Sequence, residues 1–115
     1  MSLSDRFIEV QGNQVTVKGI GKPKTIQVPE EVARFVEDNV AVIQDIISDP
    51  KFRRRLAHPG AFRSLFLLLY SRSIGVAPYK IARRYGVAPE QLYRIERALK
   101  WDGLYERVMS GLKRG

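Results

Sequence analysis

The sequence lacks the residues on which several kinds of site depend. It contains no cysteine and a single histidine, His58, among 115 residues. Disulfides and thiolate chemistry are therefore excluded, and a zinc site built from one histidine and carboxylates is not expected. No apolar run approaches the roughly 20 residues that span a bilayer, and the first residues lack the basic and then apolar pattern of a signal peptide. We therefore expect a cytoplasmic protein with no cofactor and no membrane partner.

Catalytic motifs are also missing. The chain has no glycine-rich phosphate loop and no pair of histidines, and its adjacent carboxylates, Glu30-Glu31 and Glu37-Asp38, fall on the polar face of a predicted helix. General acid–base catalysis requires a positioned group with a tuned pKa, and no such constellation is present. The sequence thus predicts a binding protein rather than an enzyme, without a small-molecule substrate.

Acidic residues are scarce in the second half of the chain. Residues 51–115 contain 15 basic and four acidic residues, a net charge of +11, whereas residues 1–50 contain five basic and eight acidic residues, a net charge of −3. Such segregation predicts a polyanionic partner for the second half. Nucleic acid is favoured over a membrane surface, because no helix combines a broad apolar face with a dense Lys/Arg face.

The first half predicts a β-hairpin followed by a helix. Residues 6–18 alternate about Gly12-Asn13, a two-residue turn of the primed type, so that one face of the hairpin is apolar. Residues 25–28 predict a third strand. Apolar residues between positions 29 and 47 recur every three or four residues, which predicts one amphipathic helix. The expected cross-strand pairs are Ile8 with Val17, Glu9 with Thr16, Val10 with Val15 and Gln11 with Gln14.

The second half predicts short helices separated by proline and glycine. They are expected over residues 50–56, 61–73, 78–85, 89–100 and 104–112. The segment 61–73 is apolar nearly all round, so it should lie at the centre of the core. We expect a mostly α-helical (α+β) fold that forms one compact unit. Residues 1–50 supply a packing or dimerisation element in this interpretation, and residues 51–115 supply a basic helical bundle.

The stretch PYKIARRYGVAPEQLYRIER, residues 78–97, has the pattern of a helix-turn-helix. Two helices that cross steeply need a small residue at the crossing, here Ala82, and a residue that tolerates a left-handed backbone four positions later, here Gly86. Apolar residues must then bury the junction. The residues at those positions are Ile81, Tyr85, Val87, Leu92 and Ile95.

On these residues the chain resembles the helix-turn-helix DNA-binding superfamily, in the style of resolvase, transposase and regulator modules that read IA..YGV...LYRI. The resemblance covers about 40 residues when residues 61–73 serve as the first helix, and it does not extend to residues 1–50. Ala88 departs from the pattern, since such modules usually place a Ser or Thr there to cap the second helix. Pro89 and Glu90 favour the first turn instead.

The resemblance implies that the helix 89–100 enters the major groove of duplex DNA while the preceding helix holds phosphates. Gln91, Arg94 and Arg97 are then the candidates for reading bases, and Glu90 contributes only by accepting from a cytosine amino group. Arg63 and Arg72 would extend the phosphate contacts. The predicted nucleic-acid-binding residues are Tyr79, Lys80, Arg83, Arg84, Gln91, Tyr93, Arg94, Arg97, Arg53, Arg54 and Arg55.

Several alternatives remain open at this level. Tyr93 fits packing in the junction as well as contact with a base, and the Arg53–Arg55 run fits ion pairs with the acidic first half as well as DNA contact. All five tyrosines and Trp101 lie in the basic half, so binding of single-stranded DNA or RNA by stacking is an alternative function. A protein–protein adaptor that uses the same fold is another. We expect a homodimer or higher homo-oligomer, with the hairpin and the 29–47 helix as its interface, because one small module buries little surface on DNA.

A ribbon-helix-helix repressor is a weaker alternative. The stretch KTIQVPEEVARFV, residues 24–36, has the strand-then-helix order of such proteins. The preceding hairpin and the missing signature of a second helix argue against it.

Overall fold

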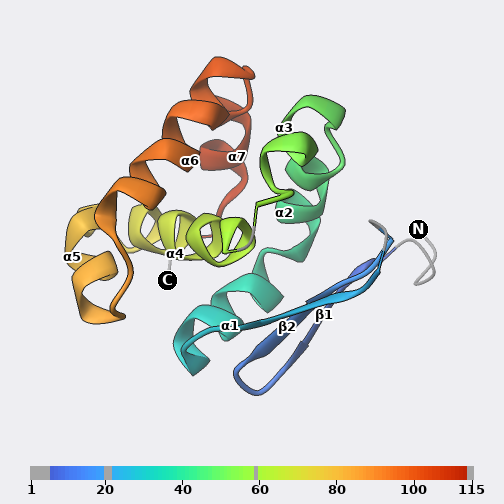
Figure 1. Cartoon of the computed structure of the whole chain (residues 1–115), viewed down its shortest axis with the longest axis horizontal. Coiled ribbons are helices and arrows are strands. Elements are labelled where there is room, and N and C mark those ends of the chain that lie inside the picture. Colours follow the sequence, from blue (N-terminus) through green and yellow to red (C-terminus); the bar gives the residue numbers. More distant parts are fainter. Residues whose placement is uncertain (1–5, 20–21, 59, 114–115) are drawn as a thin grey trace.

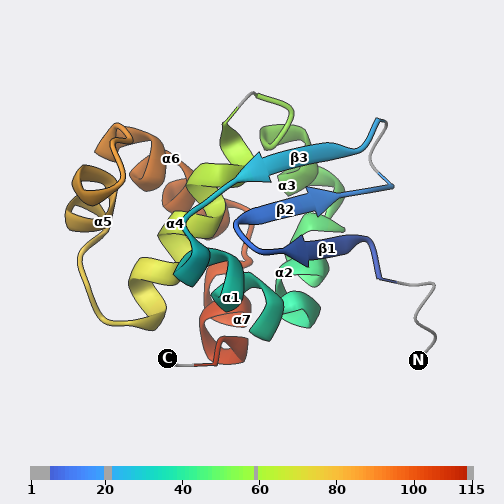
Figure 2. The same cartoon turned by 90° about the horizontal axis from the view of Figure 1, so that it is seen from below.

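The computed structural model describes residues 6–19, 22–58 and 60–113. A three-stranded antiparallel sheet lies on one side of a helical bundle, as Figures 1 and 2 show. The mostly helical α+β fold is thereby confirmed. The strands are β1 (Ile8–Gln11), β2 (Gln14–Val17) and β3 (Lys24–Gln27). The helices in the described residues are α1 (Glu30–Asp38), α2 (Val40–Ile47), α3 (Pro50–Arg55), α4 (Ala61–Ser73), α5 (Pro78–Arg84), α6 (Pro89–Trp101) and α7 (Tyr105–Gly111).

The hairpin of β1 and β2 has the predicted register. Ile8 lies opposite Val17 and Val10 opposite Val15, and β3 pairs with the other edge of β2, beginning one residue earlier than expected. Gly12 has a φ of 58° and no non-glycine residue in the described ranges has a positive φ. This combination is typical of a type II′ turn, which needs glycine at its first central position. The apolar face of the hairpin packs against α1.

The predicted single helix over residues 29–47 is wrong, because Asn39 divides it into α1 and α2. Asn39 is only 4% exposed and has φ −124° and ψ 24°, outside the helical region. Its amide Nδ2 donates to the Phe35 carbonyl oxygen at 2.9 Å, and its Oδ1 accepts from the Lys113 backbone N–H at 2.7 Å. The break allows α1 to cover the sheet while α2 packs against α3 and α7.

The core is continuous between the two halves of the chain. α4 lies at its centre, where it packs against α1, α5, α6, α7 and β3, and its residues 65–69 are fully buried. The same cluster contains Ile8 and Val15 of the sheet. The apolar faces of the hairpin and of α1 and α2 are therefore used inside the chain, so a homodimer interface on these elements would have to use their outer faces. No helix within the described ranges is both long and apolar enough to cross a membrane.

Candidate nucleic-acid interface

Helices α4, α5 and α6 form a three-helix unit, in which α4 packs against both of the other two. The residues that the pattern assigned to the junction are buried there: Ile81, Ala82 and Leu92 have no exposed surface, and Ile95 is nearly buried. Tyr85 and Val87 are half-buried against the same core. The predicted packing of the α5–α6 junction is therefore confirmed.

The turn between α5 and α6 depends on Gly86, whose φ is 71°. The backbone N–H of Val87 donates to the Ala82 carbonyl at 2.8 Å, and that of Gly86 donates to the Arg83 carbonyl at 3.4 Å. These two bonds define a Schellman motif, which ends a helix with a left-handed residue and satisfies its last carbonyls. At the start of α6, Ala88 makes no side-chain cap, and Pro89 occupies the first turn.

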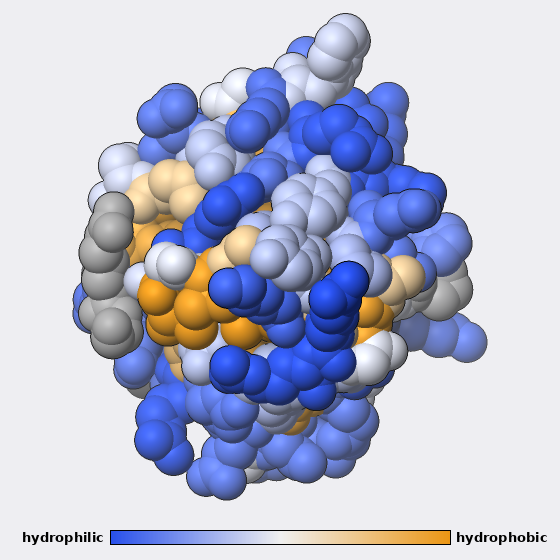
Figure 3. Space-filling view, turned by 90° about the vertical axis from the view of Figure 1, so that its left-hand side faces the viewer, coloured by the Kyte–Doolittle hydropathy of each residue, from blue (hydrophilic) through white to orange (hydrophobic). Residues whose placement is uncertain are grey.

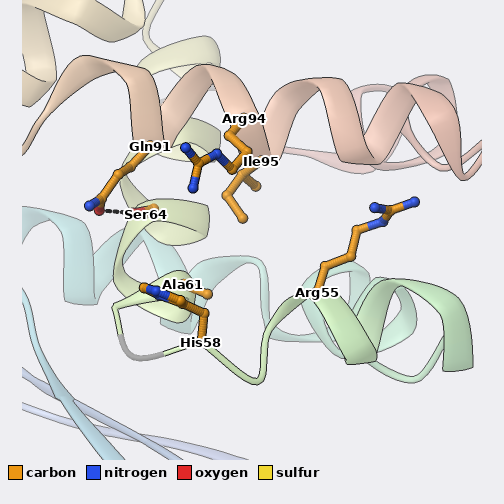
Figure 4. Close-up of a pocket in the computed structure, with 7 residues that line it drawn as sticks. All are labelled: Arg55, His58, Ala61, Ser64, Gln91, Arg94 and Ile95. Carbon is orange, nitrogen blue, oxygen red and sulfur yellow. Dashed lines mark hydrogen bonds between the residues drawn. The ribbon is translucent and has the colours of Figure 1, made fainter.

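α6 presents the base-reading candidates on its solvent side. Gln91, Arg94 and Arg97 are exposed, while Leu92 and Leu99 on the opposite side are fully buried. The side-chain oxygen Oε1 of Gln91 accepts a hydrogen bond from Ser64 Oγ at 3.3 Å, which leaves the amide nitrogen as a donor (Figure 4). Neither Arg94 nor Arg97 forms an ion pair with another described residue.

α5 carries the next group of predicted residues on an exposed surface. Lys80, Arg83 and Arg84 are exposed and form no ion pair among the described residues, and Tyr79 is 39% exposed. The Arg83 guanidinium carbon lies 5.5 Å from the centroid of the Tyr79 ring, a cation–π arrangement. Figure 3 views the molecule from the side on which α5 lies, where hydrophilic side chains surround a smaller hydrophobic area.

Tyr93 and Tyr85 lie nearer the core than the exposed residues around them. Tyr93 is half-buried, which is compatible both with packing in the α5–α6 junction and with contact with a base. The Tyr85 hydroxyl donates to Glu31 Oε1, which joins the end of α5 to α1. That hydrogen bond, helped by the charges of Arg84 and Arg34, lowers the pKa of Glu31.

The three arginines of α3 have separate environments, and none forms an ion pair with a described residue of the acidic first half. Arg55 forms a two-point contact with Asp102, with Nε–Oδ2 and Nη2–Oδ1 distances of 2.8 and 2.9 Å. The hydrogen bonds from Arg55 lower the pKa of Asp102. Arg53 donates from Nε to the Ile47 carbonyl at 3.3 Å, and Arg54 is exposed without an ion pair among the described residues. The predicted run thus divides into one arginine held by a carboxylate, one that caps α2 and one directed at solvent.

Arg72, which was expected to extend the phosphate contacts, forms an ion pair within the fold. It binds Glu96 of α6 through Nε–Oε2 and Nη2–Oε1 contacts of 2.7 and 2.9 Å, and Glu96 is 5% exposed. Burial raises the pKa of Glu96, but the hydrogen bonds and charge of Arg72 outweigh it, so the pKa lies below its ordinary value. The sequence contained a signal for the burial of Glu96 but not for its partner, because Glu96 falls among the buried positions of the helical pattern between Leu92 and Leu99.

A groove runs between α3 and α6, and Figure 1 shows α6 with α5 on one flank and α3 on the other. Its floor is apolar, formed by Ile95 and Ala98. Towards the start of α6 the groove continues to Ser64 and His58, below Gln91 and Arg94 in Figure 4. The remaining residues that line it are Lys51, Arg54, Arg55, Arg94, Arg97, Trp101 and Asp102. We call this feature the α3–α6 groove; Lys51 and Asp102 had not been identified from the sequence.

No group of three or more His, Asp or Glu side chains in the described part of the chain is arranged to hold a metal ion. Comparison of the chain with protein-family models, with curated proteins and with solved structures finds no match. The chain's own residues are therefore the basis on which its function is proposed.

Proposed function

We propose that this chain binds double-stranded DNA through α6, which enters the major groove, with α5 contacting the phosphate backbone. One observation carries the proposal. Gln91, Arg94 and Arg97 stand on the exposed side of a helix whose opposite side is anchored in the core by Leu92 and Leu99. A rigid helix with amide and guanidinium groups on its free side has the donors that read adenine and guanine edges.

The distribution of charge on α6 also supports DNA binding by its exposed side. Arg94 and Arg97 form no ion pair among the described residues, so their charges are not used to stabilise the fold. The buried carboxylate of the same helix, Glu96, is neutralised from inside by Arg72 and does not offset them. Arginines of this kind lose little on leaving water for a phosphate or a base, and release of counterions from DNA adds to the affinity.

The helices on either side of α6 carry cations that can contact the phosphates bordering the DNA major groove. α5 carries Lys80, Arg83 and Arg84 on one flank of α6, and α3 carries Arg54 on the other. Phosphate contacts of this type set the register of a helix on DNA without reading the sequence. A homodimer would place two copies of α6 on successive turns of the duplex, and this assembly is part of the proposal.

The test is equilibrium binding of labelled duplexes over a salt series, with wild type and an Arg94→Ala/Arg97→Ala double variant. Each bidentate contact with a base is worth about 1–3 kcal/mol, so the double variant should bind about 100-fold more weakly at low salt. The matched control is Lys18→Ala/Arg107→Ala, which removes two positive charges from exposed ion pairs: Lys18 follows β2 directly, and Arg107 lies in α7. We expect the control to retain affinity within about threefold.

Two results would contradict the proposal. If both double variants lose affinity equally, binding follows net charge rather than α6. If wild type shows no salt-dependent binding to any duplex, α6 does not read DNA, and the basic half serves an acidic protein partner instead.

A further inference from the structure

Trp101 is the most exposed large hydrophobic residue of the described chain, with 84% of its surface accessible. It is the last residue of α6 and lies one helical turn beyond Arg97, on the same side as Arg94. Indole rings contribute strongly to cores and interfaces when covered, and here the ring packs on almost nothing. Its exposure is thus unexplained by the fold and by duplex binding through Gln91, Arg94 and Arg97.

The surroundings of the ring are cationic. Trp101 lines the α3–α6 groove together with Lys51 and Arg54 of α3, and neither of these two forms an ion pair among the described residues. Arg97 brings a third cation from α6. An accessible aromatic face beside cations that form no ion pair is the arrangement that holds a base by stacking and its phosphates by charge.

Hydrogen bonds fix the backbone that directly follows Trp101. Asp102 follows Trp101 and receives two hydrogen bonds from Arg55, which ties the end of α6 to α3. The next turn is closed by the Leu104 N–H, which donates to the Leu99 carbonyl at 2.9 Å. Arg55 therefore positions the two sides of the groove, and a ligand meets a preformed site rather than a flexible chain end.

We propose that Trp101 stacks on an unpaired DNA base, and that Lys51 and Arg54 hold the phosphates of that strand. The inference rests on the proposed function for its orientation, since Trp101 is the last residue of the helix that is proposed to enter the major groove and would lie beyond the bases read by Gln91 and Arg94. In a fully paired duplex the faces of the bases are covered by their neighbours, so an indole ring finds a free face only at an overhang, a gap or a displaced base. The protein should consequently prefer a duplex that carries a single-stranded extension.

The experiment uses the full chain and three labelled DNAs: a blunt duplex, the same duplex with a short single-stranded extension, and the single strand alone. Trp101 is the only tryptophan in the chain, so its intrinsic fluorescence reports directly on stacking. We expect the extension to raise affinity about tenfold and to quench the fluorescence, since stacking of one base on an aromatic ring is worth a factor of about 5 to 150. The blunt duplex should bind without quenching.

Variants separate the ring from the charges. Trp101→Ala should bind the blunt duplex as wild type does and lose the tenfold preference for the extension, whereas Trp101→Phe should retain part of it. Lys51→Ala, which leaves the Arg54 contact proposed for the duplex in place, should lower the preference for the extension and the salt dependence of that preference. Because Trp101 is so exposed, the substitutions should leave the helical signal in circular dichroism unchanged.

The outcomes distinguish this inference from the function on which it rests. Tight binding of the blunt duplex, with neither preference for the extension nor quenching, would overturn the stacking site and leave the proposed function intact. Quenching by the single strand without blunt-duplex binding would support the stacking site and overturn the duplex proposal. Fluorescence that shifts with protein concentration in the absence of DNA would overturn the stacking site, because a second copy of the chain would then cover the ring.

Discussion

Basic side chains before and after residue 50 have different partners. In the first half, most of the described basic residues contact a carboxylate of the same half: the pairs are Arg6–Glu37, Lys18–Glu9 and Arg34–Glu30. In the second half, the ion pairs are Arg55–Asp102, Arg72–Glu96 and Arg107–Asp45. Most of the other described basic residues there, including those of α5 and the outer side of α6, form none.

The difference separates charges that form ion pairs within the fold from charges that form none among the described residues and that we propose bind DNA. Arg72 and Arg55 point to specific carboxylates and connect α4 and α3 to α6. Arg94 and Arg97 project from the same helix into solvent. Removing an arginine of the first kind should therefore lower stability, and removing one of the second kind should lower only binding.

The largest effect on stability is expected from Glu96→Ala. It would leave the partly buried Arg72 guanidinium without its carboxylate and create a small cavity between α4 and α6. Breaking a fully buried ion pair costs about 3–5 kcal/mol, and since about a third of the Arg72 side chain is exposed we expect about 2–3 kcal/mol in the free energy of unfolding. The measurement is urea unfolding followed by circular dichroism.

Glu90→Ala is the matched control for this substitution. It removes the same kind of side chain, a glutamate, from the first turn of α6, where that side chain is exposed. We expect a change within about 0.5 kcal/mol. Equal losses for the two variants would show that the Arg72–Glu96 pair does not support the fold.

Protonation of Glu96 at acid pH should weaken the Arg72–Glu96 ion pair. The pKa of Glu96 lies below its ordinary value of 4.5, and the pKa of Asp102 lies below its ordinary value of 3.8 because of the hydrogen bonds from Arg55. A carboxyl group with a lowered pKa in the folded state adds stability that is complete above the unfolded value and is lost as the pH falls. Wild type should lose more free energy of unfolding between pH 6 and about pH 3 than Glu96→Gln does. Parallel profiles for the two proteins would refute this assignment.

The helix boundaries of the second half could be predicted because proline and glycine mark them. Pro78 and Pro89 open α5 and α6, and Gly86 ends α5 with a left-handed residue. The hairpin register followed in the same way from Gly12 and the alternation of apolar residues. These signals are local, so one sequence is enough to read them.

The break at Asn39 and the buried Arg72–Glu96 pair were not predicted, because both depend on distant residues. Asn39 has neither proline nor glycine beside it, and its Oδ1 is satisfied by a backbone N–H 74 positions away at Lys113. Nothing in the sequence distinguishes Arg72 from the other basic residues of the second half. Only the packing of α4 on α6 brings it within hydrogen-bond distance of Glu96. The α3–α6 groove likewise exists only once α3 and α6 are side by side.

Phosphate contacts from α5 should have a smaller effect on affinity than the contacts of α6. Lys80→Ala and Arg83→Ala should each weaken binding to all duplexes by a similar factor, and each should reduce the salt slope by about 1. Gln91→Ala should instead change the ranking of duplex sequences while it leaves the salt slope unaltered. A change of sequence preference in the α5 variants would assign base reading to α5 and require a different orientation on DNA.

The smallest effect is expected from Tyr85→Phe, which removes one contact between the two halves. Tyr85 is half-buried as a residue, and its hydroxyl donates to the exposed Glu31 in an exposed hydrogen bond, so loss of the hydroxyl should cost only about 0.5 kcal/mol of unfolding free energy. Burial, and next the hydrogen bond to Glu31, raise the pKa of Tyr85, so this contribution is complete at neutral pH and is lost only as the pH rises above about 10. Duplex affinity should stay within about twofold of wild type, because the ring still packs at the α5–α6 junction. A large loss of affinity with unchanged stability would mean that the hydroxyl contacts DNA, which would place Tyr85 with the ligand-binding residues of the second half.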